Sequence, residues 1–220
     1  MKKEFVIICV CFLLVMTSIS AIGQIINNTI IKNDSESYPT NNGDKWIKTY
    51  GGLLWDSGKM VQLTNDGCYI VAGETCIELG DPFGDWDYWL IKIDAMGNKI
   101  WDKKFSLYGF DKCSAVKQTS DDGFILVGAS QKSVYPHNDA VWLIKTDKNG
   151  VKEWDKTYME GKLAINGIQN VIQTGDGGYA IISDITQIGA SDTYIIRTDD
   201  AGNIIWEKEI TGIFLDDYGE

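Results

Sequence analysis

A short pattern, tryptophan followed two residues later by lysine, recurs four times in this chain of 220 residues. The tryptophans are Trp46, Trp101, Trp154 and Trp206, so successive copies are 55, 53 and 52 residues apart. Self-similarity at a nearly constant step indicates a repeat architecture, in which each copy forms one supersecondary unit. No other feature of the sequence constrains the fold as strongly.

Each unit contains four segments in the same order, separated by turn residues. The segments are 4–8 residues long, rich in β-branched and aromatic residues, and lack helical spacing, which predicts strands. The turn between the third and fourth segments has the pattern Asp-x-x-Gly, which suits a short hairpin loop with glycine in the left-handed conformation. These turns are Asp94–Gly97, Asp147–Gly150 and Asp199–Gly202.

The central segments of each unit are apolar on both faces. Along Tyr88–Ile93, for example, Trp89 and Ile91 point to one side, whereas Tyr88 and Leu90 point to the other. Such a sheet must be covered on both sides, and like units stacked face to face supply the cover. The sequence therefore predicts an all-β fold, a β-propeller of four-stranded blades.

The predicted ring is open or incomplete. It has about three full blades, at about 55–105, 110–158 and 162–210, plus an orphan N-terminal strand at Trp46–Tyr50. Asp216–Gly219 resembles the start of another unit. Because propellers close with 4–8 blades, we expect the remaining blades to come from a longer product or a second chain.

A polar pattern also recurs in step with the repeat. Lys92, Lys145 and Arg197 end the third segment of each unit, and Asp102, Asp155 and Glu207 follow the tryptophan of the fourth segment. If these segments pair from Asp94 and Asn98 onwards, Lys92 and Asp102 are diagonal neighbours on one face. We interpret this as a structural ion pair rather than a ligand site.

The first 45 residues differ from the repeats in composition. Met1-Lys2-Lys3 and the apolar run that follows predict a signal peptide at residues 1–23, and an Asn- and Ser-rich stretch predicts a flexible polar tether at 24–44. The partial propeller then covers 45–220, with no later run long enough for a membrane span. The chain is thus expected to be secreted or held at the cell surface, where Asn27 and Asn33 would be glycosylation acceptors.

Charge and cysteine content narrow the function classes. The net charge is −11 and Arg197 is the only arginine, which argues against nucleic acid as a partner. Three cysteines follow the predicted signal peptide: Cys68, Cys76 and Cys113. They allow one disulfide plus a free thiol, or none, and we interpret them as small buried hydrophobes at strand positions.

Several short motifs recur at the same spacing in each unit. Together they resemble secreted bacterial and archaeal β-propeller repeats, which are grouped near the quinoprotein dehydrogenase-like (PQQ-like) propeller superfamily. The residues that carry the resemblance are Gln173–Tyr179 with its partner copies, Lys92–Trp101, and Tyr50–Gly52. The likeness covers about Lys45 to Gly219. It implies the propeller fold, and only weakly any function, because such repeats often occur as surface modules.

The same resemblance raises a quinone-dependent oxidoreductase as one alternative. Those dehydrogenases typically hold the quinone with a stacking tryptophan, a disulfide between adjacent cysteines and a calcium ion. This sequence has no adjacent cysteine pair after the signal peptide. A degenerate quinoprotein-like oxidoreductase is therefore the less favoured interpretation, and no catalytic residue is assigned.

Binding is predicted on the rim that carries the variable loops. The longest loop holds Asp81, Asp85, Trp86 and Asp87, whose carboxylates could bind calcium and whose indole could stack on a sugar. Tyr135 and His137, the only histidine, lie in the next variable loop and complete the candidate ligand-binding set. No resident metal is otherwise predicted.

The leading hypothesis is a non-catalytic, exported β-propeller module that binds or scaffolds protein or carbohydrate at the cell surface. The alternative is an accessory or partial domain of a carbohydrate-acting enzyme whose active part lies elsewhere.

Overall fold

The computed structural model describes residues 46–76, 85–131, 139–162, 165–187 and 190–210. Twelve β-strands and no helix occur in these ranges, so the predicted all-β class is confirmed. The predicted signal peptide, the tether with Asn27 and Asn33, and the Asp216–Gly219 segment lie outside the described residues. Within the described ranges, no helix is long or apolar enough to cross a bilayer.

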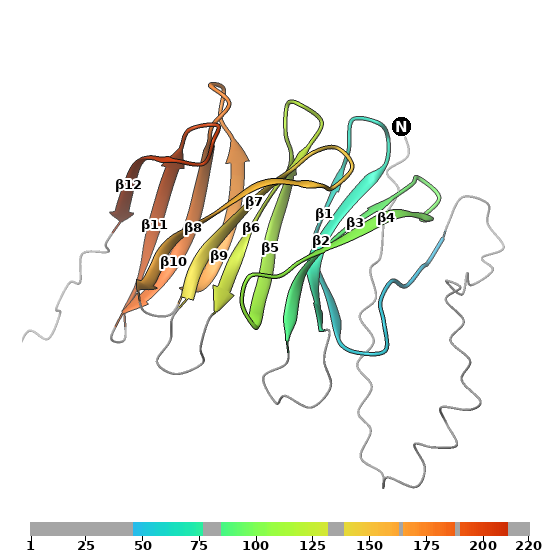
Figure 1. The fold of residues 1–220 in the computed structure, drawn as a ribbon, viewed down its shortest axis with the longest axis horizontal. Helices are drawn as coiled ribbons and strands as arrows, with labels where there is room; N and C mark the ends of the chain where they lie inside the picture. The colour runs from blue at the N-terminus through green and yellow to red at the C-terminus, as the bar shows by residue number, and fades with distance from the viewer. Residues whose placement is uncertain (1–45, 77–84, 132–138, 163–164, 188–189, 211–220) are drawn as a thin grey trace, which may run out of the picture.

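The strands form three antiparallel meanders of four, which lie beside one another (Figure 1). A single parallel pair, Trp86 with Phe110, links the first two meanders into one eight-stranded sheet, while the third is a separate four-stranded sheet. We call the meanders sheets 1, 2 and 3. Their strands are β1 (Asp56–Leu63), β2 (Tyr69–Cys76), β3 (Trp86–Ile93) and β4 (Lys99–Phe105); β5 (Phe110–Gln118), β6 (Phe124–Gln131), β7 (Asp139–Thr146) and β8 (Lys152–Lys162); β9 (Ile165–Gln173), β10 (Tyr179–Gln187), β11 (Ala190–Thr198) and β12 (Ile204–Ile210).

The turn between the third and fourth strands is built by its aspartate. In sheet 1 the Asp94 carboxylate accepts the backbone N–H groups of Met96 (2.8 Å) and Asn98 (2.7 Å). Gly97 has a φ of 75°, a conformation that costs glycine little. The carboxylate thus stabilises the backbone of its own turn, which is the role that its position in the sequence suggests.

A β-bulge follows each of these turns. Ile93 pairs with Lys99, but Lys92 pairs with Trp101, so Ile100 is an extra residue in β4. A one-residue shift moves every following side chain of β4 to the other face. Lys92 therefore shares its face with Trp101. The same shift occurs in the other sheets at Lys145/Thr146 and Arg197/Thr198.

The bulge makes the predicted ion pair of Lys92 with Asp102 wrong. Lys92 instead bonds Asp66 in the turn between β1 and β2 (2.5 Å). Asp102 pairs with Lys99 (2.8 Å) and accepts a hydrogen bond from the Trp89 indole (2.9 Å). The equivalent cations of sheets 2 and 3 also bond the first turn of their own sheet, through Lys145 to Asp121 and Arg197 to Asp176.

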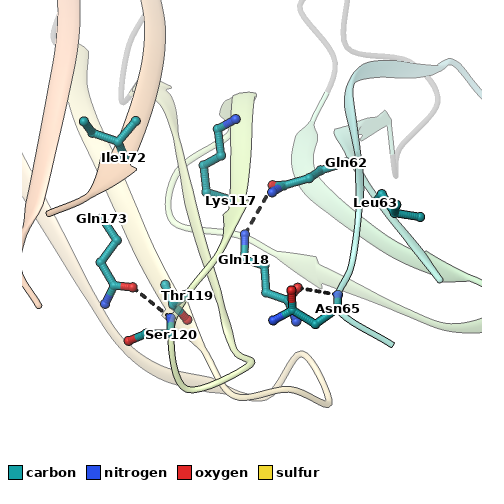
Figure 2. A pocket seen from close by; sticks show the side chains of 9 residues that line it. All are labelled: Gln62, Leu63, Asn65, Lys117, Gln118, Thr119, Ser120, Ile172 and Gln173. Atoms are coloured by element: carbon teal, nitrogen blue, oxygen red, sulfur yellow. Dashed lines mark hydrogen bonds between the residues drawn. The ribbon is translucent and has the colours of Figure 1, made fainter. Parts of the chain in front are cut away.

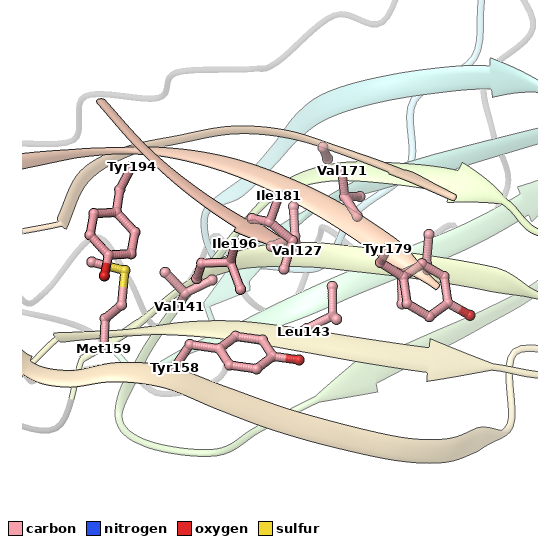
Figure 3. Packing of buried hydrophobic residues seen from close by; sticks show 12 residues of the cluster. Val127, Val141, Leu143, Tyr158, Met159, Val171, Tyr179, Ile181, Tyr194 and Ile196 are labelled. Atoms are coloured by element: carbon pink, nitrogen blue, oxygen red, sulfur yellow. The ribbon is translucent and has the colours of Figure 1, made fainter. Parts of the chain in front are cut away.

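The hydrophobic core lies between the sheets, as two separate layers. Sheets 1 and 2 bury Tyr88, Leu126 and Trp142 between them, with the Tyr88 and Trp142 rings 4.7 Å apart. Sheets 2 and 3 bury a second cluster that includes Leu143 and Ile196 (Figure 3). Sheet 2 therefore buries side chains on both of its faces, one against sheet 1 and the other against sheet 3, because a single sheet cannot cover its own apolar surface.

The outer face of sheet 1 is packed by the segment Trp46–Tyr50. Trp46 and Tyr50 lie against Trp89 and Ile91 on this face. The segment was predicted as an orphan strand, but it forms no β-ladder and contacts sheet 1 through side chains. The described sheets close into no barrel or ring, so the structure establishes the all-β class and the stacking but not a propeller.

Candidate functional site

The predicted loop site is described only in part. Asp81, Tyr135 and His137 lie outside the described residues. Asp85 is half-buried and directly precedes β3, while Trp86 and Asp87 are its first two residues. These two are therefore strand residues rather than residues of a loop tip.

Packing constrains both strand residues. The Trp86 ring lies 6.3 Å from that of Trp55, and its backbone N–H donates to the carbonyl of Gly109. Asp87 is only 5% exposed, and its Oδ1 has no hydrogen-bond partner within the described atoms. Burial raises the pKa of Asp87, although a hydrogen bond with Ser106 opposes the shift.

No group of three or more His, Cys, Asp or Glu side chains that could hold a metal ion occurs among the residues the structure describes. Because Asp81 is not among them, the calcium site expected at Asp81, Asp85 and Asp87 stays a prediction. Among the described residues, Cys68, Cys76 and Cys113 form no disulfide. Cys113 is buried between sheets 1 and 2, where burial raises its pKa well above the usual value.

An open pocket of about 500 Å³ lies elsewhere, at the ends of the first strands of all three sheets (Figure 2). It is at the end of the sheets that carries the short, uniform turns, opposite to the variable loops. Three glutamines come together here from β1, β5 and β9. Gln118 and Gln173 occupy one repeat position, which Leu63 holds in β1, and Gln62 lies one residue earlier. The lining residues are Gln62, Leu63, Asn65, Lys117, Gln118, Thr119, Ser120, Ile172 and Gln173.

The glutamine side chains link neighbouring sheets through the backbone. Gln62 Oε1 accepts the N–H of Gln118 (3.3 Å), and Gln118 Oε1 accepts the N–H of Asn65 (2.9 Å). Gln173 Oε1 accepts the N–H of Ser120 (2.8 Å). The amide nitrogens of Gln118 and Gln173 also donate within their own turns, to the carbonyls of Asp122 and Gly177, so these two side chains mainly hold the sheets and turns together. No such bond is made by the amide nitrogen of Gln62 within the described residues, which leaves it available to a ligand.

The pocket wall also combines a cation with exposed apolar side chains. Lys117 lies between Gln62 and Ile172 in Figure 2. No bond joins its ammonium to another described residue. Leu63 is 61% exposed and Ile172 is 51% exposed, so the rim is apolar on either side of this charge. An ammonium beside exposed aliphatic groups suits a ligand with both an acidic and an apolar part.

A buried cation holds the turn that forms the pocket floor. Lys145 donates to Asp121 (2.8 Å), one residue beyond the lining residue Ser120, and Thr119 Oγ1 also donates to Asp121. Burial acts to raise the pKa of Asp121, but the hydrogen bonds from Lys145 and Thr119 outweigh it and lower that pKa to about 2. Asp121 is thus a charged, positioned turn residue at neutral pH.

The lining residues offer hydrogen bonding. Ser120 and Thr119 carry hydroxyl groups, and the Thr119 hydroxyl donates to the Asp121 carboxylate just outside the lining. The lining therefore offers groups that can bind a polar ligand.

Sequence reasoning did not find this pocket. Its one visible signal was a glutamine at or next to the end of the first segment of every unit, at Gln62, Gln118 and Gln173. The residues lie 56 and 55 positions apart, and only the stacking of three sheets brings them together.

No family model matches this chain, and no curated protein matches it.

Proposed function

We propose that this protein is a non-catalytic, exported binding module of β-propeller type, which acts at the cell surface through the pocket at the ends of β1, β5 and β9. The single observation that carries the proposal is this pocket, whose lining combines the Lys117 ammonium, which bonds no described residue, with the side-chain amide of Gln62. The signal-peptide pattern of residues 1–23 supports export.

The propeller assignment is supported by which strands meet. The first strand of each sheet lies against the first strand of the next, β1 on β5 and β5 on β9. In a propeller the first strand of every blade faces the central axis, so first strands converge. The resemblance to secreted propeller repeats points the same way. A pocket at that axis is a common location for ligands between repeated units.

The ligand that fits best is an acidic carbohydrate of the cell surface. Lys117 would pair with a carboxylate or sulfate, and the amide groups of Gln62 and Asn65 would bind hydroxyls. The exposed Leu63 and Ile172 side chains would contact the apolar face of a sugar ring. An acidic peptide offers the same charge, and the test separates the two.

The experiment is binding of the mature chain to an array of acidic and neutral glycans, followed by titration calorimetry with the best ligand. We expect acidic glycans to bind, and Lys117→Glu to weaken that binding at least tenfold, because the charge is reversed at the site. Lys148→Glu is the matched control, since Lys148 is exposed in the β7–β8 turn and does not line the pocket.

Binding that is equal for acidic and neutral glycans, or unchanged in Lys117→Glu, would contradict this assignment. Binding only to acidic peptides would retain the pocket but reject carbohydrate as its ligand.

A further inference from the structure

One contact between neighbouring sheets is made repeatedly in this molecule. The ring of a fourth-strand tryptophan covers the glycine of the next third-to-fourth turn. A Cβ built on Gly150 would lie 2.8 Å from Trp101 Cζ3, and one built on Gly202 would lie 2.9 Å from Trp154 Cζ3. Only glycine permits so close an approach of the ring.

The residues that follow the tryptophan complete the contact. Tyr158 donates its hydroxyl to the carbonyl of Gly202 (2.7 Å), and Lys156 Nζ lies 3.5 Å from Asn203 Oδ1. A tryptophan, a lysine and a tyrosine at alternate positions thus recognise a Gly-Asn turn. The contact combines ring packing with two hydrogen bonds, which gives it a defined register.

The segment Trp46–Tyr50 makes the same contact with sheet 1. Trp46 covers Gly97, the Tyr50 hydroxyl donates to the Gly97 carbonyl (2.5 Å), and Lys48 donates to Asn98 (2.5 Å). Trp46 Nε1 also donates to the Ala95 carbonyl (3.0 Å). Unlike β8, however, this segment belongs to no strand, so side chains alone hold it in place.

The fourth copy of the pattern has no such partner among the described residues. Trp206 is 48% exposed on β12, and Ile210 is 49% exposed at the end of the strand. Trp206 pairs with Arg197 and Lys208 pairs with Ile195, so all four face away from sheet 2. This face has the tryptophan and the lysine of a contact that the chain already makes elsewhere, with Ile210 in place of the tyrosine.

We propose that the outer face of β12 docks on the Asp94–Asn98 turn of a second copy of this chain, in place of that copy's own Trp46–Tyr50 segment. Trp206 would cover Gly97 of the partner, and Lys208 would bond Asn98 of the partner. In the single chain, Trp46–Tyr50 acts as a removable cap on the docking turn.

Two observations favour a second copy as the occupant. The turn of sheet 1 is Gly97-Asn98, identical to the Gly202-Asn203 turn that sheet 2 already recognises. In addition, β12 is already ordered before docking, because it is hydrogen-bonded to β11. Ile195 and Ile182 lie on the same face of this sheet and would contact the partner together with β12. An ordered sheet loses less conformational entropy on docking than a five-residue segment does.

This association is head-to-tail, because the donor and acceptor faces lie at opposite ends of the stack. A heterologous contact of this kind either closes into a ring or extends into a filament. Two copies would bring six four-stranded sheets together, a number within the 4–8 that propellers use.

The test is sedimentation velocity on the full mature chain over a range of concentrations. Replacing Trp46, Lys48 and Tyr50 with alanine removes the cap, and we expect the dimer dissociation constant to fall at least tenfold. Adding Trp206→Ala and Lys208→Ala should return this uncapped variant to a monomer. Val151→Ala, which removes an exposed hydrophobe in the β7–β8 turn of sheet 2, should have no effect.

A milder variant guards against unfolding of the uncapped chain. Lys48→Ala with Tyr50→Phe keeps the Trp46 ring over sheet 1 and its indole hydrogen bond to Ala95, and removes the hydrogen bonds that Lys48 and Tyr50 donate to the turn. It should associate to an intermediate degree. The proposal is overturned if this variant remains a monomer with native circular dichroism, or if association persists without Trp206 and Lys208.

Discussion

The face that sheet 2 turns towards sheet 3 and the face that sheet 3 turns away from it carry equivalent repeat positions, yet only the first is buried. Leu143 in sheet 2 is fully buried, whereas its counterpart Ile195 in sheet 3 is only half-buried. Trp154 lies over Gly202, while the matching Trp206 is 48% exposed. The neighbouring sheet therefore decides what these side chains contribute, since apolar area stabilises only when it is removed from water.

A substitution on the buried face of sheet 2 should lower the free energy of unfolding the most. Leu143→Ala deletes part of the layer between sheets 2 and 3 and should lower the free energy of unfolding by about 2–5 kcal/mol. Ile195→Ala, at the equivalent outward position, should cost roughly 1 kcal/mol because less area is buried. Urea denaturation followed by tryptophan fluorescence measures both.

Equal losses in the two variants would show that the outer face of sheet 3 is covered in solution. That outcome would remove the contrast between the two faces.

The second test compares an internal junction with the same position at the N-terminal end of the stack. Asp111 is fully buried and accepts the N–H groups of Leu107 (2.7 Å) and Tyr108 (3.2 Å). Burial raises the pKa of Asp111 to about 6, against the opposing hydrogen bonds from Leu107 and Ser130. Asp56 accepts the N–H of Gly52 (2.7 Å) in the equivalent connection, but is only half-buried.

The pKa of Asp111 rises on folding, so the native state binds more protons than the unfolded state between pH 4 and 6. This group's contribution to the free energy of unfolding is therefore full below about pH 4 and is lost as pH rises through about 6. A shift from 3.8 to about 6 corresponds to up to about 3 kcal/mol. Asp111→Asn should abolish that pH dependence, and Asp56→Asn should leave it intact.

Denaturant titrations at pH 4, 5, 6 and 7 provide the measurement. A pH slope that survives unchanged in Asp111→Asn would mean that another group causes it.

The smallest effect is expected at the turn glycines. Gly202 has a φ of 78° and receives Trp154, so Gly202→Ala should combine backbone strain with displacement of the ring, at a cost of about 2 kcal/mol. Gly67 also has a φ of 78°, but a Cβ there would meet nothing within 4 Å. Gly67→Ala should therefore cost only the strain, about 1 kcal/mol.

Thermal unfolding by circular dichroism distinguishes the pair. If the two alanine variants melt at the same temperature, the contact of Trp154 with the turn contributes nothing measurable to stability.

The ion pairs show where prediction from the sequence fails. The repeat of Lys92 and Asp102 was visible, but their pairing depended on the register of β3 and β4. The bulge at Ile100 shifts that register by one residue, so Asp102 lies on the opposite face from Lys92. The Lys92 ammonium bonds Asp66 instead. Nothing local to Ile100 signals the extra residue, because a bulge is one solution to sheet twist and stacking.

The candidate pocket could not be predicted from the sequence, for a related reason. Gln62, Gln118 and Gln173 are far apart in the chain, and each has a separate partner in a neighbouring sheet. Their convergence follows from the stacking of three sheets and from no motif within one of them.

The amino-acid sequence by itself determined the strands, the Asp-x-x-Gly turns and the need of every sheet for a neighbour. These features depend on side chains within a few residues of one another, such as the Asp94 carboxylate and the N–H of Asn98. The tertiary structure alone decided the strand register after each bulge, the partners of the buried cations and which apolar faces are covered. Those outcomes depend on packing between units about fifty residues apart, where many arrangements satisfy the same local preferences.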